Sequence, residues 1–588
     1  MKDKTKVAAD GSKKSEVQSG DLDVAKDRGQ VSEPVGFVIG TEDSTPLNFW
    51  VGVRDDAYLQ LDDAVVVETP VPGRGTVRIS GIVQQVRARH EGAQFDTDVF
   101  LVDRGVLPVE TAVAAEVVAT RFEPEVFVPP RPGLIASRAR GAERDHAMYF
   151  DQMERRLPAG LSRDGEPIFL DLDFLDGTKG AHVNISGISG VATKTTYALF
   201  LLYALFNTEA LGQYRANTKA IVFNVKGEDL MWLDRPNSRL PGEARRDYEK
   251  LGLPVQPFDS VGLWAPVRAG AGGQALPAVE SRADGVTAYY WTIREFVRER
   301  FLRFLFAEAE DERSQIADLV ARIEHYLDRE CEDDPDSEAT VVRHGTAVVD
   351  FDGLCDLIAN ELEHDGSPWR GRVAEATVGA FERRLDAARF RVGHLIWGRQ
   401  ADQPGAHRID FEAHQVTVVD IHGLHDRAKR FVTGVVLKRL FEQKERMGQR
   451  VPLHFLVLDE LNRYAPRDGR GPIKEVLLDV AERGRSLGLV LIGAEQTASE
   501  VENRIIANSA FRVVGRLDTA EAARAEYGFL PAVTRQRAGI LKPGSMILQQ
   551  PHVPVPLQVR FPFPCWATRS EEAGPAAAGD VFARFRTP

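Results

Sequence analysis

The sequence has few cysteines, no long apolar run and no excess of positive charge. The chain of 588 residues contains three cysteines, and Cys331, Cys355 and Cys565 lie too far apart for a disulfide framework or a zinc site. No run approaches the roughly 20 apolar residues of a membrane span. The first residues also lack the apolar core of a signal peptide. These absences predict a cytoplasmic protein without a membrane segment.

The charge balance disfavours a surface rich in cations. The formal net charge is −13, whereas contacts with nucleic-acid phosphates need clustered Lys and Arg. A ring can confine such cations to its pore and carry acids outside, so the net charge does not exclude a nucleic-acid ligand. The apolar fraction of 43% and the charged fraction of 27% are ordinary for a globular protein. The length predicts about three or four domains.

The N-terminal part divides into a polar tail and a strand-rich segment. Residues 1–33 contain little apolar sequence and predict a disordered tail. Over residues 34–125, short apolar runs alternate with Gly, Pro and Asp, which predicts a small β-barrel. A β-sandwich fits the same pattern. The proline-rich stretch 123–133 is stiff and is expected to be a boundary.

The remainder predicts a discontinuous α/β core. Residues 135–270 and 411–545 contain strands that alternate with helices, a pattern typical of a mostly parallel sheet. Between them, the strand signal fades over residues 271–410, which predicts an inserted helical subdomain with helices over 291–306 and 373–397. Residues 546–588 are expected to form extended C-terminal bracing segments and a tail.

The stretch HVNISGISGVATKTT, residues 182–196, predicts a strand, a phosphate-binding loop and a helix. Small residues let backbone N–H groups face an anion, and the helix N-terminus and the lysine add positive charge. The loop departs from GxxxxGK[ST], because its first glycine lies seven residues before the lysine and a threonine replaces the last glycine. A tight turn without a ligand is the alternative. The candidate nucleotide-binding residues are Gly187, Gly190, Ala192, Thr193, Lys194, Thr195 and Thr196.

A second stretch, HFLVLDE at residues 454–460, is a buried-type strand that ends in Asp459 and Glu460. A P-loop NTPase needs an Asp there to order the metal's waters and a Glu to polarise the attacking water. One such strand could simply end in two solvated acids. The occurrence of both stretches in this order favours a nucleotide site.

Two other polar stretches are candidates for ligand contacts. Residues 220–225 form an apolar strand followed by Lys226, Gly227 and Glu228, at the strand end where open α/β sheets bind ligands; ordinary loop chemistry is the alternative. The loop after Glu460 carries several cations that could line a pore and bind phosphates, or could be a solvated linker. These cations are Arg463, Arg467, Arg470 and Lys474.

The ordered set of segments resembles the HerA branch of the HerA/FtsK ring ATPases over about residues 34–562. The set comprises the barrel, the phosphate loop preceded by His182, FNVKGED, the helical insertion, VTVVDIHGL, VLDELNRYAP, AERGRSLGL and a strand ending in Gln496. VLDELNRYAPR is the most specific part. The resemblance implies a hexameric ring of RecA-like cores that binds ATP and Mg²⁺ between subunits and moves double-stranded DNA through its pore, beside a nuclease or another effector in DNA repair or phage defence.

The resemblance also implies roles for the matching residues. Lys194 would bind the β- and γ-phosphates, Thr195 the Mg²⁺, and Asp459 would order the waters of the metal.

On the catalytic side, Glu460 would activate the attacking water and Gln496 would sense the γ-phosphate. Arg483 or Arg485 would act as the arginine finger of a neighbouring subunit, a contribution worth about 10³ to 10⁵ in rate.

Three functions are therefore in competition. The leading hypothesis is an ATP-driven double-stranded DNA translocase or helicase of the HerA type. The alternative is a ring scaffold that bound nucleotide stabilises, with weak or no ATPase activity, and that recruits an effector through its barrel. A monomeric P-loop kinase is a third hypothesis, although the sequence contains no acceptor-binding or lid pattern.

Overall fold

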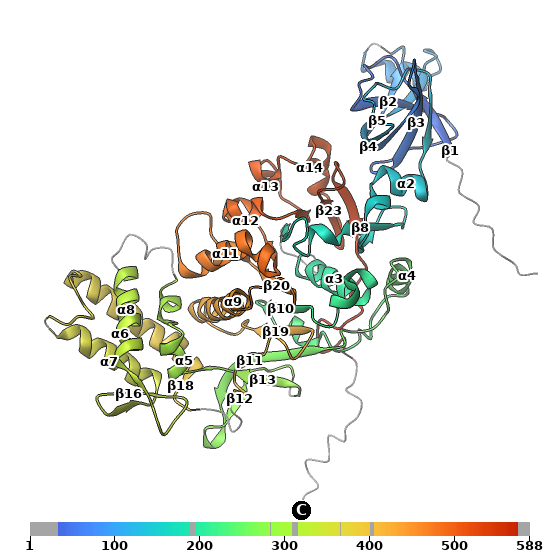
Figure 1. The fold of residues 1–588 in the computed structure, drawn as a ribbon. Helices are drawn as coiled ribbons and strands as arrows, with labels where there is room; N and C mark the ends of the chain where they lie inside the picture. Colours follow the sequence, from blue (N-terminus) through green and yellow to red (C-terminus); the bar gives the residue numbers. More distant parts are fainter. Residues whose placement is uncertain are drawn as a thin grey trace, which may run out of the picture.

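The N-terminal part of the computed structural model is a closed antiparallel barrel (Figure 1). The structure describes residues 33–93, 95–188, 194–282, 284–307, 316–364, 366–399 and 405–573, so the tail expected over residues 1–33 lies outside the described residues except for its last position. The barrel strands follow the order β1-β2-β5-β4-β3-β6. They are β1 (Glu33–Val38), β2 (Asn48–Val53), β3 (Ala64–Val71), β4 (Gly75–Glu91), β5 (Glu110–Glu123) and β6 (Ile135–Arg138).

Alternating apolar side chains fill the barrel, as expected for strands with one buried face. Val51, Val65 and Val117 are completely buried there. The barrel extends beyond residue 125, because β6 follows the proline-rich stretch and pairs with both β1 and β3 to close it. On the side facing the rest of the chain, Arg537 Nη1 donates to Asp62 Oδ1 at 3.0 Å and ties the barrel to the core.

A large mixed sheet forms the core, and its central strands are parallel. In spatial order they are β11 (Val261–Ala269), β19 (Val416–Asp420), β10 (Lys219–Asn224), β20 (His454–Asp459), β21 (Leu489–Glu495), β9 (Val183–Ser186) and β22 (Phe511–Val514). The phosphate-loop strand β9 and the acid-bearing strand β20 are thus separated by β21. Their carboxyl ends lie at one edge of the sheet, so the expected α/β core with an N-terminal barrel is confirmed.

Three long helices cover this sheet: α3 (Lys194–Asn207), α9 (Asp426–Met447) and α11 (Pro472–Leu487). Helix α3 is apolar on all sides, and every residue from Tyr197 to Phe206 is buried, as expected for a helix enclosed by other elements. Helices α9 and α11 end at Gly448 and Gly488, each in the left-handed conformation that glycine adopts without steric cost.

The inserted part is helical but continues the sheet at its start. Strands β12 (Ala275–Pro277) and β13 (Val286–Tyr289) pair with β11. Helix α5 begins with a capping box between Thr292 and Glu295 and ends at Arg298, earlier than the expected helix over 291–306. Arg300, with a φ of 56°, breaks the helix, and a 3₁₀ helix follows. The other helices are α6 (Ile316–Glu330), α7 (Phe351–Glu363) and α8 (Glu375–Val392).

The C-terminal part returns to the core. Strands β23 (Ser545–Gln549) and β24 (Leu557–Arg560) extend the sheet in antiparallel pairs toward β7 (Arg156–Leu161) and β8 (Pro167–Asp171). Residues 561–573, here called the C-terminal segment, then pack against α3, where the buried Trp566 ring lies 5.2 Å from the Tyr203 ring. In the described part of the chain, no helix combines the length and apolar character needed to cross a membrane.

Candidate nucleotide site

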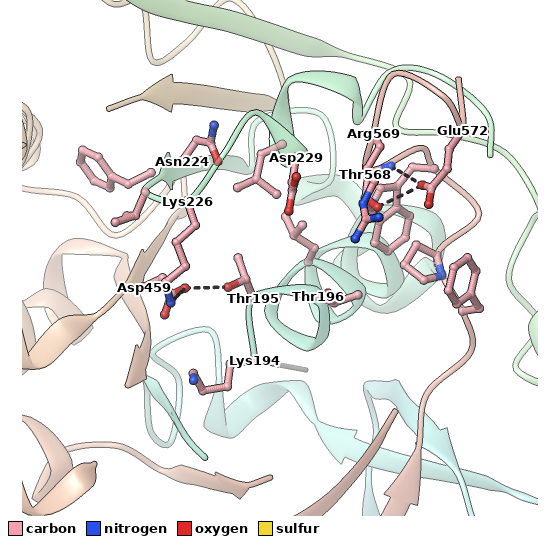
Figure 2. Close-up of a pocket in the computed structure, with 17 residues that line it drawn as sticks. Lys194, Thr195, Thr196, Asn224, Lys226, Asp229, Asp459, Thr568, Arg569 and Glu572 are labelled. Carbon is pink, nitrogen blue, oxygen red and sulfur yellow. Dashed lines mark hydrogen bonds and ion pairs between the residues drawn. The ribbon is translucent and has the colours of Figure 1, made fainter. Parts of the chain in front are cut away.

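The phosphate-loop helix and the acid-bearing strand meet at the carboxyl edge of the sheet. Thr195, in the first turn of α3, donates a hydrogen bond from Oγ1 to Asp459 Oδ2 at 2.9 Å, across 264 residues of sequence (Figure 2). Asp459 is nearly buried at the end of β20, and its other oxygen accepts from the backbone N–H of Glu460 at 2.8 Å. Both oxygens therefore have defined positions.

Lys194 begins α3 and is buried, with its Nζ 2.7 Å from the backbone oxygen of Gly187. Its ammonium thus bridges the two ends of the loop. Burial lowers the pKa of Lys194, and the carboxylate of Asp459 opposes that shift. At Gly187, whose φ is 155°, a Cβ would lie 3.1 Å from Gly515 Cα, closer than most Cβ contacts, so both the backbone and the neighbouring chain favour glycine there. The expected ligands Gly190, Ala192 and Thr193 lie outside the described residues.

A lysine lies between the two acids. Lys226, just beyond β10, places Nζ 3.2 Å from Asp459 Oδ2 and 3.2 Å from Glu460 Oε1. Burial disfavours the ammonium, but the two carboxylates outweigh it and raise the pKa of Lys226. Glu460 also accepts from Arg463 Nε at 2.8 Å. Lys226 is therefore shared by both acids, and Glu460 has Arg463 as a second cationic partner.

The backbone at Glu460 is in the left-handed region, with a φ of 58°. A residue with a Cβ pays about 1–3 kcal/mol for such a conformation, and strain of this kind concentrates at functional sites. The conformation turns the chain sharply after β20, so that Asp459 and Glu460 both reach the edge of the sheet.

Glu228, another candidate at a strand end, does not join these acids. Its carboxylate accepts hydrogen bonds from the backbone N–H groups of Glu280 and Ser281 at 2.9 and 2.7 Å.

Glu495 is an additional acid that the sequence analysis did not single out. It ends β21, next to Ser186 at the end of β9, and is completely buried. Burial raises the pKa of Glu495 well above its usual value, and the positive charge of Lys194 opposes this shift only in part. Burial therefore favours the neutral form of this carboxyl. A polar residue at the end of a predicted buried strand was the only signal for it in the sequence.

Gln496 and the two candidate finger arginines lie apart from this cluster. Gln496 follows Glu495 and is exposed. Arg483, on the outer face of α11, pairs with Glu445 and lies 3.7 Å from Asp479. Neither side chain contacts the Thr195–Asp459 pair within this chain.

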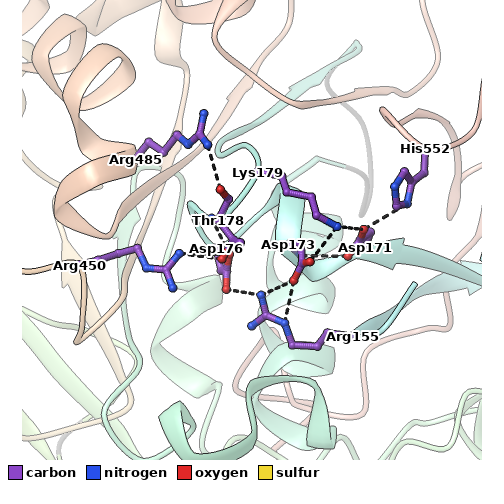
Figure 3. A network of polar contacts seen from close by, with 9 residues as sticks. All are labelled: Arg155, Asp171, Asp173, Asp176, Thr178, Lys179, Arg450, Arg485 and His552. Atoms are coloured by element: carbon purple, nitrogen blue, oxygen red, sulfur yellow. Dashed lines mark hydrogen bonds and ion pairs between the residues drawn. The ribbon is translucent and has the colours of Figure 1, made fainter. Parts of the chain in front are cut away.

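Arg485 is part of a network of hydrogen bonds and ion pairs around the loop after β8, which it joins through backbone oxygens (Figure 3). Its Nη2 donates to the backbone oxygen of Thr178 at 2.9 Å. In the same network, Arg155 binds Asp173 and Asp176, with its Nη2 2.6 Å from Asp176. The pKa of Asp173 is raised by burial, but hydrogen bonds from Lys179 and Arg155 outweigh this and lower it. The network also includes Asp171, Arg450 and His552.

The cationic loop after Glu460 is largely bound to the protein itself. Lys474 is buried, donates to the backbone oxygen of Gly469 at 2.8 Å and lies 2.7 Å from Glu502. Arg467 lies 2.8 Å from Glu526. The hypothesis that Lys474 lines a pore is therefore wrong, because its ammonium closes the loop from inside.

A cavity of about 250 Å³ opens beside Thr195 and Asp459 (Figure 2). The start of α3, the end of β10 and its following loop form its walls, and the C-terminal segment closes the far side. Nothing in the sequence pattern indicates that residues beyond 560 reach this site. The lining residues are Lys194, Thr195, Thr196, Leu199, Phe223, Asn224, Val225, Lys226, Asp229, Leu230, Asp459, Phe563, Pro564, Trp566, Thr568, Arg569 and Glu572.

The residues at this end of the cavity fit Mg²⁺. The Thr195 hydroxyl and the Asp459 carboxylate are adjacent oxygen donors, and Mg²⁺ typically takes one or two carboxylates and completes its shell with phosphate and water oxygens. Within the described ranges, no group of three or more His, Cys, Asp and Glu side chains could form a metal site made by the protein alone. The donor set therefore suits a metal that arrives with a phosphate ligand.

Neither the protein-family models nor the curated protein sequences contain a match to this chain. Among solved structures, VirB4 of Thermoanaerobacter pseudethanolicus is 16% identical, with 70% of this chain and 97% of that chain covered and a TM-score of 0.42. The bacterial conjugative coupling protein TrwB in an unbound form is 11% identical, with 72% and 92% covered and a TM-score of 0.43. These likenesses are too distant to carry an argument about function.

Proposed function

We propose that this chain is a Mg²⁺-dependent ATPase of the HerA type that moves double-stranded DNA as a hexameric ring. The observation that carries the ATPase proposal is the hydrogen bond between Thr195 and Asp459. It brings together the hydroxyl after the loop lysine and the acid at the end of a buried strand, which are the two groups that P-loop NTPases use to bind the metal.

The neighbouring side chains suit phosphoryl transfer. Lys194, at the start of α3, would bind the β- and γ-phosphates with the N-terminus of the helix. Bound Mg²⁺ would neutralise charge on the phosphates, with Thr195 and Asp459 as its protein partners. Glu460 would orient the attacking water and accept its proton, which requires that its carboxylate leave Lys226 and Arg463.

The ring and its DNA ligand rest on the resemblance to the HerA branch. In that arrangement, Gln496 would sense the γ-phosphate, and Arg483 or Arg485 would reach the ATP of the next subunit. Arg485 would have to leave the backbone oxygens of Gly177 and Thr178, whereas Arg483 is half exposed and would have to leave the carboxylates of Glu445 and Asp479. The barrel, at one end of the molecule (Figure 1), would be the surface for a nuclease or another effector.

The test is ATP hydrolysis by the purified protein, with and without duplex DNA, at low and at raised salt. We expect stimulation by DNA that weakens as salt rises, because phosphate contacts release counterions. Lys194→Ala should abolish hydrolysis with and without DNA. A wild-type protein that hydrolyses no ATP overturns the ATPase proposal, and hydrolysis without stimulation at low salt overturns the translocase proposal.

A second candidate is a ring scaffold that nucleotide stabilises without turnover. The observation that favours it is the double pairing of the Glu460 carboxylate with Lys226 and Arg463, which occupies the group that hydrolysis needs. For a scaffold, Lys194→Ala should dissolve the ring in sedimentation while Glu460→Gln retains function. Loss of function in Glu460→Gln with an intact ring favours the motor.

A further inference from the structure

The C-terminal segment forms a wall of the cavity that the proposed chemistry does not use. Trp566 anchors it, because its ring is completely buried between Tyr203 of α3 and Phe258, with ring centroids 5.2 and 5.1 Å away. The backbone of the segment is also fixed. Ala567 N donates to Arg235 O at 2.8 Å, and Asn237 N donates to Cys565 O at 2.9 Å.

A closed turn follows this anchor. The Glu572 carboxylate accepts from the backbone N–H and the hydroxyl of Thr568 at 2.9 and 3.0 Å. Ser238 donates to the backbone oxygen of Glu572 from both its N–H and its hydroxyl, at 2.8 and 2.7 Å. The turn between Thr568 and Glu572 is thus rigid, and it presents the Arg569 side chain at the mouth of the cavity (Figure 2).

The Arg569 guanidinium is available for a ligand. It is exposed and lines the cavity, and within the described residues its side chain makes no hydrogen bond or ion pair. Its charge acts on Asp229, another residue that lines the cavity: burial raises the pKa of Asp229, and the charge of Arg569 reduces that rise.

The two ends of the cavity differ in chemistry. Thr195, Asp459 and Lys226 lie at one end, where the metal and phosphates are expected, and Arg569 lies at the other, on the same segment as the lining residues Phe563 and Pro564 (Figure 2). Apolar and aromatic side chains beside a planar guanidinium form a surface on which a nucleobase stacks. Phosphates would not gain from the apolar side chains.

We propose that the C-terminal segment binds the nucleoside part of the nucleotide and that Arg569 is its principal contact with the base. The inference rests on the proposed nucleotide site. It assigns the phosphates to the start of α3 and the base to a turn about 375 residues further along the chain, so each subunit completes its own nucleoside pocket only after its last strand has folded onto the sheet.

The experiment compares the affinities of two ligands, ATP and inorganic tripolyphosphate, each with Mg²⁺, by calorimetric titration of the full chain. Arg569→Ala should weaken ATP binding at least about fivefold, the lower limit for loss of one base-stacking contact, and leave tripolyphosphate binding unchanged. Arg569→Lys should weaken ATP binding similarly, because it keeps the charge but not the plane. Arg524→Ala removes an exposed arginine elsewhere and serves as the charge-matched control, with both affinities unchanged.

Three outcomes separate the inference from the proposed function. Unchanged ATP affinity in Arg569→Ala overturns the inference alone. The inference is also overturned if Arg569→Ala weakens the binding of ATP and of tripolyphosphate equally and Arg569→Lys restores both affinities. The guanidinium would then contact phosphate. A wild type that binds neither ligand, with Lys194→Ala indistinguishable from it, overturns the proposed nucleotide site itself.

Discussion

Lys226 makes the most direct prediction about how the site changes when a nucleotide binds. Its ammonium lies 3.2 Å from an oxygen of Asp459 and 3.2 Å from one of Glu460. A divalent cation bound by Asp459 would compete with this ammonium for the same carboxylate oxygen. Removing the charge in Lys226→Met should therefore strengthen Mg²⁺ binding, even though the substitution also removes a cation from a site for anions.

The magnitude follows from the exposure of the lysine. The Lys226 side chain is 45% exposed, so each of its ion pairs is screened and contributes about 0.2–1 kcal/mol. If both ion pairs break when Mg²⁺ binds, the free energy of Mg²⁺ binding is less favourable by twice that amount. Removing the lysine charge should therefore raise the Mg²⁺ affinity about 2- to 30-fold. The nucleotide-free protein should also melt at a lower temperature, because two adjacent carboxylates lose their shared cation.

The assay is a Mg²⁺ titration at saturating ADP, with thermal unfolding as a second readout. Lys226→Arg should bind Mg²⁺ within about twofold of the wild type, since it keeps the charge. Lys219→Met, at the other end of β10, removes one charge far from the acids and should change nothing. Weaker Mg²⁺ binding in Lys226→Met would refute the reasoning, because the ammonium would then act as a phosphate ligand and not as a competitor.

Three further predictions concern the surroundings of the site. Burial lowers the pKa of His182 to about 4 from 6.5. As the pH falls below 6.5, the imidazole is protonated in the unfolded chain but stays neutral in the fold, so the free energy of unfolding decreases by about 2 kcal/mol between pH 7.5 and 5. His182→Asn, which tolerates the positive φ of 68° and keeps an acceptor for Leu491 N, should remove that loss in urea unfolding. Burial raises the pKa of Glu495, so stability falls by about 1.4 kcal/mol per pH unit above 4.5 until that pKa is reached; Glu495→Gln should be more stable than the wild type at pH 8. Trp566→Ala should destabilise the protein by about 3–5 kcal/mol and weaken ATP more than tripolyphosphate in titrations at 10 °C.

Each of these has an outcome that contradicts it. An unchanged loss of stability between pH 7.5 and 5 in His182→Asn would mean that another group titrates in that range. A Glu495→Gln variant less stable than the wild type at pH 8 would show that the carboxyl is ionised and paired in the fold. If Trp566→Ala is folded by circular dichroism and loses affinity for ATP and tripolyphosphate equally, the C-terminal segment does not contact the nucleoside.

Much of the core could be predicted from local pattern. The buried strand before Lys194 and the strand ending in Asp459 were recognisable because apolar runs of strand length end abruptly at polar residues. The break of the helix at Arg300 was not predictable, because the apolar spacing continues through it. The barrel strand after the proline-rich stretch was also missed, since only pairing with both β1 and β3 identifies Ile135–Arg138 as part of the barrel.

The candidate site divides in the same way. The resemblance to the HerA branch assigns Thr195 and Asp459 to one metal, and the structure joins them by a hydrogen bond. Which acids pair with the cationic side chains could not be predicted from the sequence. Lys474 was indistinguishable by sequence from an exposed cation, and its burial depends on Glu502, in a different loop.

The sequence by itself determined the elements and their chemistry: a strand-rich N-terminal unit, a small-residue loop ending in Lys194 and Thr195, and a buried strand ending in two acids. These features are local, since periodicity and turn residues encode them within a few residues of chain. Only the tertiary structure placed β21 between β9 and β20, brought Lys226 between the acids and laid the C-terminal segment with Arg569 across α3. Such contacts join residues hundreds of positions apart, and they are set by the order of strands and the packing of side chains, which no single stretch of sequence specifies.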